Sequence, residues 1–341
     1  MAIPGIPGFF VHHGIASSHR SSLVRSIVFL AAVVVSPAAS AQTFPSKPLR
    51  MIVPFAPGGV ADIVARIVGQ KMGERFGQSV VIDNRAGAGG SLAGEITAKA
   101  RPDGHTILLC SSSVLVINPL LSPNLNYDPK SDLATVSLIS SSPYVLLVHP
   151  SSPFATVRDL IAAAKAKPGA LNYGSAGVGS ASHLVGEVFR SMANIQLTHV
   201  PYKGTALAAN DLLSGQLHMM FEAISASLPN IKAGRVRALG IGTRKPFAVT
   251  PNIPPISEAG VPGFEGTTWQ GLCAPAGTPR PIVATLHKAV LQAIRSPDVS
   301  ERFSALGVEG VGSGPDDFRA FVNAELVRLA KAIREAGIKA Q

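Results

Sequence analysis

The chain is poor in cysteine: its 341 residues include only Cys110 and Cys273. The two are distant in sequence and form neither a C-x-x-C pair nor a Cys/His zinc pattern, so we expect no bound metal. Both lie in apolar, strand-like contexts, ILLC and WQGLC, which favour two buried free thiols. A disulfide between them would require export from the cytoplasm and a short Cα separation.

Acidic and aromatic residues are also scarce. Lysine and arginine number 30 and aspartate and glutamate 20, so the formal net charge is +10, and aromatic residues make up 6% of the chain. The cations are scattered, with no run of five and few aromatic residues beside them, which argues against nucleic-acid binding. The charge balance instead favours a general attraction for anionic solutes.

Near the N-terminus, the apolar run Ile27–Val35 is far shorter than the roughly 20 residues that span a bilayer. Arg20 and Arg25 precede this run, and the small residues Ala39-Ser40-Ala41 follow it. The pattern predicts a secretory signal peptide over residues 1–41, cleaved after Ala41, and hence a periplasmic protein. Cleavage leaves 300 residues with a net charge of +8.

Beyond residue 42, short apolar segments alternate with helical patterns. We expect strands at 51–55, 80–83, 106–110, 144–148, 171–174, 198–201, 216–221, 236–243 and 269–273, and three final helices over 281–295, 300–306 and 315–337. The Pro- and Gly-rich segment 249–266 is predicted to be a surface connection. This alternation is typical of an α/β protein with mostly parallel sheets flanked by helices.

The exported chain is long enough to form two lobes with separate cores. Crossings between the lobes are predicted at 145–150 and 269–275. We therefore expect a discontinuous first lobe from 42–147 plus 268–341 and a second lobe from 148–267. Two such lobes can close about a hinge on a ligand.

Three glycine-rich turns join a strand to a helix, within Arg50–Val68, Val80–Ala100 and Leu171–Phe189. A helix start presents unpaired backbone N–H groups and the positive end of the helix dipole, so it attracts anions. Glycine allows the backbone to approach a ligand closely. Three such turns predict a carboxylate held between two lobes.

The candidate ligand-binding residues follow from these turns and from neighbouring strand ends. The first turn supplies Phe55, Pro57, Gly58, Gly59 and Val60, the second Arg85 and Ala88, the third Ser175, Ala176, Gly177, Ser180 and His183, and two further strand ends supply Ser112, Ser113 and Glu222. An ordinary turn capped by Asp62 explains the first set equally well. Arg85 could pair a ligand carboxylate or hold its own loop, and Glu222 could accept an ammonium group or order a water. His183 suits helix capping or packing better than metal binding.

Motifs of the common enzyme classes are absent. A dinucleotide fingerprint in the second turn would need glycine in place of Leu92, and no G-K-[ST] follows, so we expect no nucleotide cofactor. The third turn lacks G-x-S-x-G, and His183 with Glu187 does not form H-E-x-x-H. A hydrolase using Ser175 or Ser180 remains the enzymatic alternative, but the sequence places no general base beside either serine.

Ordered motifs across residues 44–339 give a specific resemblance. They are PFAPGG, NRAGAGGSLAGE, KARPDGHT, YDPKSDL, NYGSAGVGS, HVPYKG, IKAGRVRALG, EAGVPGFE and APAGTP. Together they resemble the tripartite tricarboxylate transporter solute-binding proteins, the Bug family.

The resemblance implies a two-lobed fold like a type II periplasmic binding protein, acting as a monomer that captures an organic acid and delivers it to membrane permease subunits. It also implies that the first and third turns hold one carboxylate through backbone amides and waters, which falls on Phe55, Gly58, Gly59, Ser175, Ala176 and Ser180. Glu222 stands where the family usually has aspartate. The resemblance implies no catalysis, and a receptor for a signalling partner is the alternative within binding proteins.

Overall fold

The computed structural model describes residues 44–335, 337 and 338. The predicted signal peptide lies outside these residues. Within them, no helix is both long enough and apolar enough to cross a bilayer.

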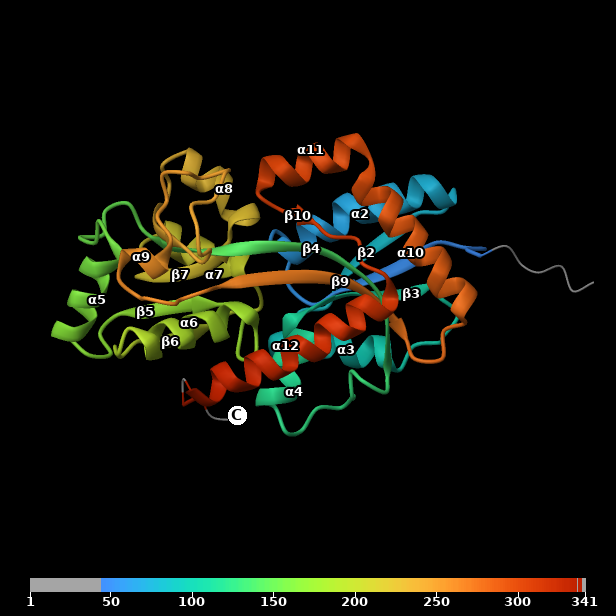
Figure 1. Ribbon diagram of the computed structural model, residues 1–341, viewed down its shortest axis with the longest axis horizontal. Coiled ribbons are helices and arrows are strands. Elements are labelled where there is room, and N and C mark those ends of the chain that lie inside the picture. The colour runs from blue at the N-terminus through green and yellow to red at the C-terminus, as the bar shows by residue number, and fades with distance from the viewer. Residues whose placement is uncertain (1–43, 336, 339–341) are drawn as a thin grey trace, which may run out of the picture. The chain divides into compact units, whose positions relative to one another are not determined.

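A single sheet of ten strands organises the described chain (Figure 1). The strands are β1 (Leu49–Val53), β2 (Val80–Asn84), β3 (Thr106–Ser111), β4 (Leu133–Val148), β5 (Asn172–Ser175), β6 (Thr198–Pro201), β7 (Met219–Ala223), β8 (Arg237–Ile241), β9 (Thr267–Pro275) and β10 (Glu309–Gly310). The order is β2-β1-β3-β9-β4-β7-β5-β6, and β8 and β10 also pair with β4.

Helices cover this sheet and connect its strands. They are α2 (Val60–Phe76), α3 (Ser91–Ala98), α4 (Asn118–Leu121), α5 (Val157–Ala166), α6 (Ala181–Met192), α7 (Thr205–Leu213), α8 (Ile224–Lys232), α9 (Ile256–Ala259), α10 (Arg280–Arg295), α11 (Pro297–Leu306) and α12 (Pro315–Glu335), with a short 3₁₀ turn η1 (Ala88–Gly90) and a π turn η2 (Ser113–Ile117). The predicted α/β class is confirmed.

The sheet is parallel towards its two ends and antiparallel in the middle. Strand β1 pairs in parallel with β2 and β3, and β5 pairs in parallel with β6 and β7. Between them, β4 pairs with β9 over Leu133–Pro143 and with β7 over Tyr144–Val148, both antiparallel. We call β1–β3 with their helices the β1 half, and β5–β8 with theirs the β5 half; β4 runs from one to the other.

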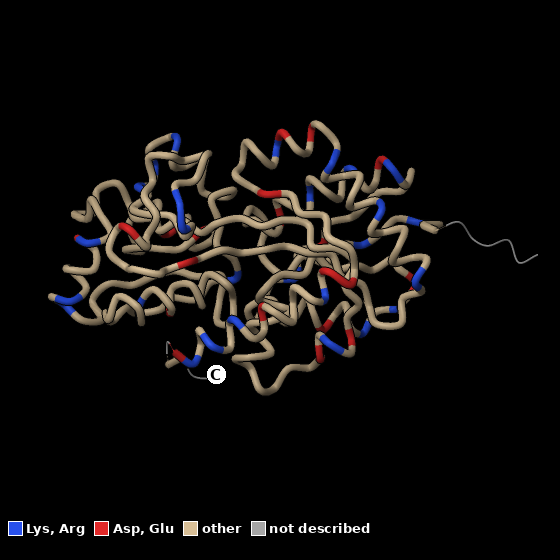
Figure 2. The backbone as a smooth tube through the Cα atoms, in the orientation of Figure 1, with Lys and Arg blue, Asp and Glu red and all other residues tan. Residues whose placement is uncertain are grey.

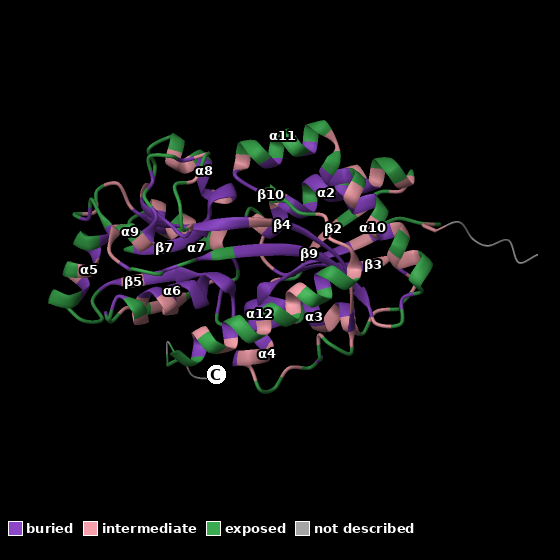
Figure 3. Ribbon diagram, in the orientation of Figure 1, coloured by how far each residue is buried: buried purple, intermediate pink, exposed green. Residues whose placement is uncertain are grey.

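The central strands are buried because helices pack on both faces of the sheet, whereas β2, β6 and β10 are partly exposed (Figure 3). One apolar cluster joins α2 and α10 to the β1 half, and another joins α7 and α8 to the β5 half. Phe264, in the segment predicted to be a surface connection, is fully buried and stacks near Phe189 and Phe221. That prediction is therefore wrong for Phe264, whose ring completes the core beneath α6.

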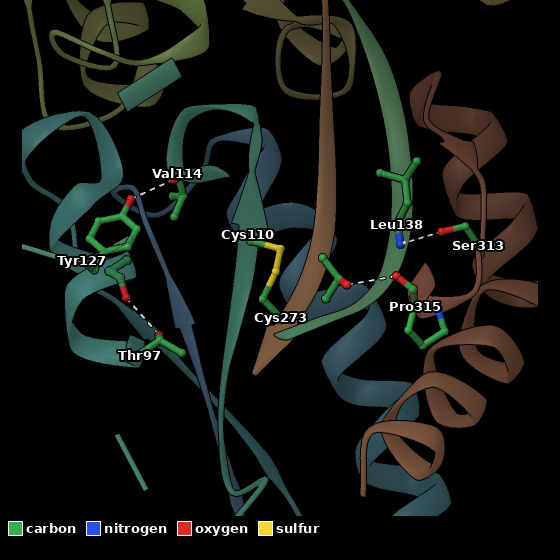
Figure 4. Close-up of a disulfide and its surroundings, with 10 residues drawn as sticks. Thr97, Cys110, Val114, Tyr127, Leu138, Cys273, Ser313 and Pro315 are labelled. Atoms are coloured by element: carbon green, nitrogen blue, oxygen red, sulfur yellow. Dashed lines mark hydrogen bonds between the residues drawn. A yellow bond between two sulfur atoms is a disulfide. The ribbon is translucent and has the colours of Figure 1, made fainter. Parts of the chain in front are cut away.

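The two cysteines are joined in a disulfide, which corrects the expectation of two free thiols (Figure 4). Strands β3 and β9 are neighbours, with Cys110 opposite Gly271 and Leu108 opposite Cys273, and the two Cα atoms lie 5.9 Å apart. This separation is within the range that a disulfide bridges. The sheet order, rather than the sequence spacing, brings the two thiols together.

We expect the disulfide to stabilise the fold because it closes a loop of 163 residues. Closing a loop of this size lowers the conformational entropy of the unfolded chain, which is worth about 5 kcal/mol at room temperature. Dithiothreitol should therefore lower the free energy of unfolding in urea by about this amount. The C110A/C273A variant should unfold at the same urea concentration with and without reductant. If dithiothreitol left the free energy of unfolding of the wild-type protein unchanged, the prediction of a stabilising disulfide would be wrong.

Candidate functional site

The three predicted strand–turn–helix units are all present. Strand β1 leads into α2, β2 leads through η1 into α3, and β5 leads into α6. The first two units belong to the β1 half and the third to the β5 half. The first and third turns lie on opposite sides of one small cavity, which we call the carboxylate cavity.

At the first turn, the Asp62 side chain already accepts a hydrogen bond from one of the backbone N–H groups. Its buried carboxylate accepts hydrogen bonds from the Gly58 N–H (3.0 Å), Asn84 (3.1 Å) and Arg66 (3.0 Å). Burial by itself would raise the pKa of Asp62, but these hydrogen bonds outweigh it and lower the pKa. Asp62 is thus a fixed anion that caps the turn, as expected if the first turn is an ordinary strand-to-helix turn capped by this residue.

The next N–H groups of α2 remain available. The backbone N–H groups of Gly59, Val60 and Ala61 have no hydrogen-bond partner among the described residues, and all three residues line the carboxylate cavity. They stand at the start of a 17-residue helix, where the dipole favours an anion. Phe55 forms an adjoining wall, as predicted.

The third turn differs from the expectation of bare N–H groups. Ser182 and Ser175 hydroxyls accept from the N–H groups of Ala176 (2.9 Å) and Gly177 (3.0 Å), and the Gly177 carbonyl accepts from the Ser180 N–H (3.1 Å). Small hydroxyl side chains therefore occupy the donors that the sequence appeared to leave open.

Hydroxyl groups take the place of those backbone donors. Ser180 and Ser182 line the cavity, and Ser180 caps α6 by accepting from the His183 N–H (3.2 Å). The Ser182 N–H has no partner among the described residues. From the β1 half, Ser113 accepts from the Ala181 N–H (3.0 Å), which leaves its own proton to donate.

The cavity floor comes largely from residues that the sequence interpretation did not assign to the site; Ser111 is the exception, because it was expected with Ser112 and Ser113 to add hydroxyl donors after the strand ending at Cys110. Ser111 ends β3, Tyr144 lies on β4, and Thr268 and Gln270 lie on β9, while Thr205 begins α7. The Ser111 hydroxyl and the Gln270 side-chain oxygen are buried and have no hydrogen-bond partner among the described residues, which marks them as groups that a ligand or water would satisfy. The sequence signal for these two residues was their position: Ser111 directly follows the predicted strand 106–110, and Gln270 lies within the predicted strand 269–273.

The carboxylate cavity is small and neutral. Its volume is about 30 Å³, room for a carboxylate group or a water or two. None of the described residues that line it is Lys, Arg, Asp or Glu. Figure 2 shows the cations dispersed along the chain instead. An anion here would be held by backbone dipoles and hydroxyls.

The predicted residues divide between this cavity and its surroundings. Those that line it are Phe55, Gly59, Val60, Ser113, Ala176 and Ser180; those that do not are Pro57, Gly58, Arg85, Ala88, Ser112, Ser175, Gly177, His183 and Glu222. Arg85 is exposed and pairs with Asp83 of its own strand (2.9 Å). His183 is buried and accepts from the Gly179 N–H (3.4 Å), a packing role.

The second turn serves as a contact between the halves. Gly89 has a φ of +60°, and a methyl group added to it would overlap the Val178 carbonyl oxygen of the third turn. Nearby, the Ala56 N–H donates to the Lys203 carbonyl (3.1 Å) across the same boundary. Glycine is required at position 89 because the opposing backbone leaves no space for a side chain.

A serine–histidine pair lies behind the third turn. The Ser175 hydroxyl is 2.6 Å from His199 Nε2, and the His199 ring stacks on His183 at 4.3 Å. Burial and the neighbouring His183 lower the pKa of His199 to about 4, so the ring is neutral at pH 7. Ser175 is fully buried and does not line the carboxylate cavity. The pair therefore supports the turn from within.

Glu222 lies one layer behind the cavity. It is 3% exposed on β7, opposite Val145 of β4, and the Thr205 hydroxyl beside it faces the carboxylate cavity. Burial raises the pKa of Glu222 to about 8, and the Thr205 hydroxyl offsets only part of this effect. Glu222 is accordingly neutral at pH 7, which spares a bound anion from a second negative charge.

This raised pKa predicts a pH-dependent stability. The unfolded chain loses the Glu222 proton near pH 4.5, whereas the folded chain keeps it until about pH 8. The contribution of Glu222 to the free energy of unfolding is therefore complete below pH 4.5. It is lost as the pH rises to about 8, at about 1.4 kcal/mol per pH unit. Glu222→Gln should flatten this slope in urea unfolding between pH 5.5 and 8.5. The exposed Glu301→Gln is the control, and equal slopes in both variants would contradict the prediction.

Comparison with known proteins identifies the family. Residues 64–338 match the family described as "Tripartite tricarboxylate transporter family receptor". Among solved structures, Rpa4515 of Rhodopseudomonas palustris with adipate is 36% identical (TM-score 0.84, covering 87% of this chain and 99% of that chain). MatC of the same organism with bound malate is 34% identical (0.82, 85% and 100%). The periplasmic binding protein BugD is 33% identical (0.85, 87% and 100%).

The match covers most of the described chain, and the structural neighbours share its sheet and helices. The expected resemblance is thereby confirmed. The chain belongs to the tripartite tricarboxylate transporter receptor family, a family of periplasmic solute-binding proteins that includes carboxylate binders.

Proposed function

We propose that the exported chain captures a small organic carboxylate between two lobes and delivers it to the permease of a tripartite transporter. The lobes are those expected from the sequence, 42–147 plus 268–341 and 148–267, and they correspond to the β1 and β5 halves. The signal peptide directs export into the periplasm and is cleaved after Ala41. In this proposal the protein acts as a monomer.

One observation carries this proposal. The N–H groups of Gly59, Val60 and Ala61 have no partner among the described residues and line the same cavity as the hydroxyls of Ser180 and Ser182. The first three belong to one half and the serines to the other. A carboxylate placed between them would accept hydrogen bonds from both halves. Such a ligand stabilises the closed arrangement because the open one offers it only one set of donors.

The binding strength follows from the neutral character of the cavity. Backbone dipoles and hydroxyls hold an anion without a permanent cation, so the anion can leave again when the lobes open. Water can occupy the remaining space and bridge to the ligand, which permits acids of different shape. The adipate and malate bound by the relatives are both carboxylates. These properties suit a receptor that hands over its ligand.

The Ser175–His199 pair is the observation that would favour a hydrolase. A hydrogen bond of 2.6 Å between serine and histidine is the usual arrangement of a nucleophile with its base. Here the serine hydroxyl also accepts from the Gly177 N–H, its residue is fully buried, and no described carboxylate bonds His199. We infer a structural role, and turnover of p-nitrophenyl esters that disappears in Ser175→Ala would contradict it.

The test of capture compares each acid with its neutral amide. Calorimetry on the exported chain with hexanoate and benzoate, and with hexanamide and benzamide, should give binding for the acids alone. Thermal unfolding should shift upward by several degrees at acid concentrations 100-fold above the dissociation constant. Equal binding of an acid and its amide, or absence of binding by hexanoate, benzoate and adipate alike, would exclude a carboxylate receptor.

A further inference from the structure

A second, larger space adjoins the carboxylate cavity. It has a volume of about 480 Å³ and shares Ala181 and Thr268 as walls with the carboxylate cavity. We call it the apolar chamber. It lies between α6 of the β5 half and α12, with β9 as its floor, and Figure 1 shows α12 running beside β9 towards α6.

The chamber walls are predominantly apolar. Leu184 and Val188 project from α6, Phe321 and Leu329 from α12, and Trp269 from β9. The Trp269 ring packs edge-on against Phe321, with the ring centres 5.4 Å apart. A space of this size and character accommodates an aromatic ring or a branched alkyl group with substituents.

The charged groups at the chamber offer nothing to a second anion. Arg328 is the one cation among the described residues that line it, and Glu325 accepts from its guanidinium at 2.6 and 2.8 Å. Glu325 also accepts from the Trp269 indole (3.3 Å), and Glu265 pairs with Arg244. Each carboxylate at the chamber is therefore balanced by an arginine, and the described residues that line it present no unpaired cation to a second carboxylate.

Ser112 provides the chamber with a polar contact next to the carboxylate cavity. Its flanking residues Ser111 and Ser113 line the carboxylate cavity, whereas Ser112 lines the chamber. The Ser112 hydroxyl is buried and has no partner among the described residues. A hydroxyl, amino or halogen substituent close to the ligand carboxylate could contact it.

We propose that the ligand is a monocarboxylate with an apolar aromatic or alkyl body, its carboxylate in the carboxylate cavity and its body in the apolar chamber. This inference rests on the proposed function and specifies the ligand class. It distinguishes the chain from its relatives, whose bound acids adipate and malate carry a carboxylate at each end.

Hexanoate and adipate give a direct test because they share a six-carbon chain and differ by one carboxylate. Calorimetry on the exported chain should show hexanoate binding at least tenfold more tightly than adipate. From acetate through butanoate to hexanoate, affinity should rise about fourfold per added methylene that is buried. Each acid should bind with one molecule per chain, with acetate measured by displacement of hexanoate.

Two variants that fill the apolar chamber from opposite walls test its role in ligand binding separately from any effect on folding. Val188→Trp on α6 and Ala332→Trp on α12 should each weaken hexanoate and benzoate at least tenfold and leave acetate unchanged. Val327→Trp, at a 75% exposed site on α12, is the control and should bind all three acids as wild type does.

The outcomes distinguish this inference from the function on which it rests. Adipate binding as tightly as hexanoate, unchanged hexanoate affinity in both filled variants, or two molecules of hexanoate per chain would overturn the inference and leave carboxylate capture intact. Absence of binding by every acid would overturn both.

Discussion

Gly89→Ala should weaken hexanoate binding at least 30-fold while the chain stays folded. The added methyl group would overlap the Val178 carbonyl oxygen, so the second and third turns could no longer approach each other. If the lobes close on the ligand, this overlap acts against the closed arrangement alone and lowers the apparent affinity by the same factor. Calorimetry measures the affinity, and small-angle scattering should show a larger radius of gyration in the presence of hexanoate than wild type shows.

The matched control for this variant is Gly77→Ala. Gly77 ends α2 with a φ of +63°, close to the +60° of Gly89, and a methyl group added there meets nothing within 4 Å. Both substitutions therefore carry the same backbone cost of about 1 kcal/mol in stability. Equal hexanoate affinity in the two variants would show that the turn contact plays no part in capture.

The strand–turn–helix units could be predicted because each is a local pattern. An apolar run, a glycine turn and an amphipathic segment specify β1–α2 and β5–α6 from neighbouring residues alone. The same reliance on local patterns explains why the predicted strand 144–148 is much shorter than β4, which runs from Leu133 to Val148. Its sixteen residues include four serines and Pro143, a composition typical of a loop, yet β9 pairs along this stretch and holds it extended. Pairing between strands distant in sequence decides such cases.

The available donors of the site could be predicted only in part. Glycines and serines near a helix start are visible in the sequence, but whether an N–H is free depends on where the neighbouring side chains turn. Ser182 turns back to the Ala176 N–H, whereas no described residue accepts a hydrogen bond from the Gly59 N–H. The disulfide is a similar case, because nothing near Cys110 specifies that β9 is the neighbour of β3.

Helix α8 shows the limit of single-residue rules. Pro229 lies inside it, and proline is normally a helix breaker. The sequence interpretation placed no helix between the predicted strands 216–221 and 236–243. The helix is nonetheless built because Ile224 and Leu228 pack into the core of the β5 half. Tertiary packing outweighs the local preference.

Ser180→Asp should reduce hexanoate affinity at least 100-fold without loss of stability. Ser180 is the N-cap of α6, and aspartate caps helices as well as serine does, so the hydrogen bond to the His183 N–H can persist. The new carboxylate would face the carboxylate cavity, which contains no described cation to compensate it. Two like charges about 4 Å apart repel by about 4 kcal/mol at a partly buried site, enough for this loss.

The matched control is Ser180→Asn, which keeps the size and the capping ability of aspartate but adds no charge. It should retain most of the hexanoate affinity, and urea unfolding of the two variants should agree within about 0.5 kcal/mol. The difference in affinity between them isolates the electrostatic effect from changes in shape. Raising the salt concentration should restore little of the lost affinity because the repulsion is shielded from solvent. Equal hexanoate affinity in Ser180→Asp and Ser180→Asn would place the bound carboxylate away from the start of α6.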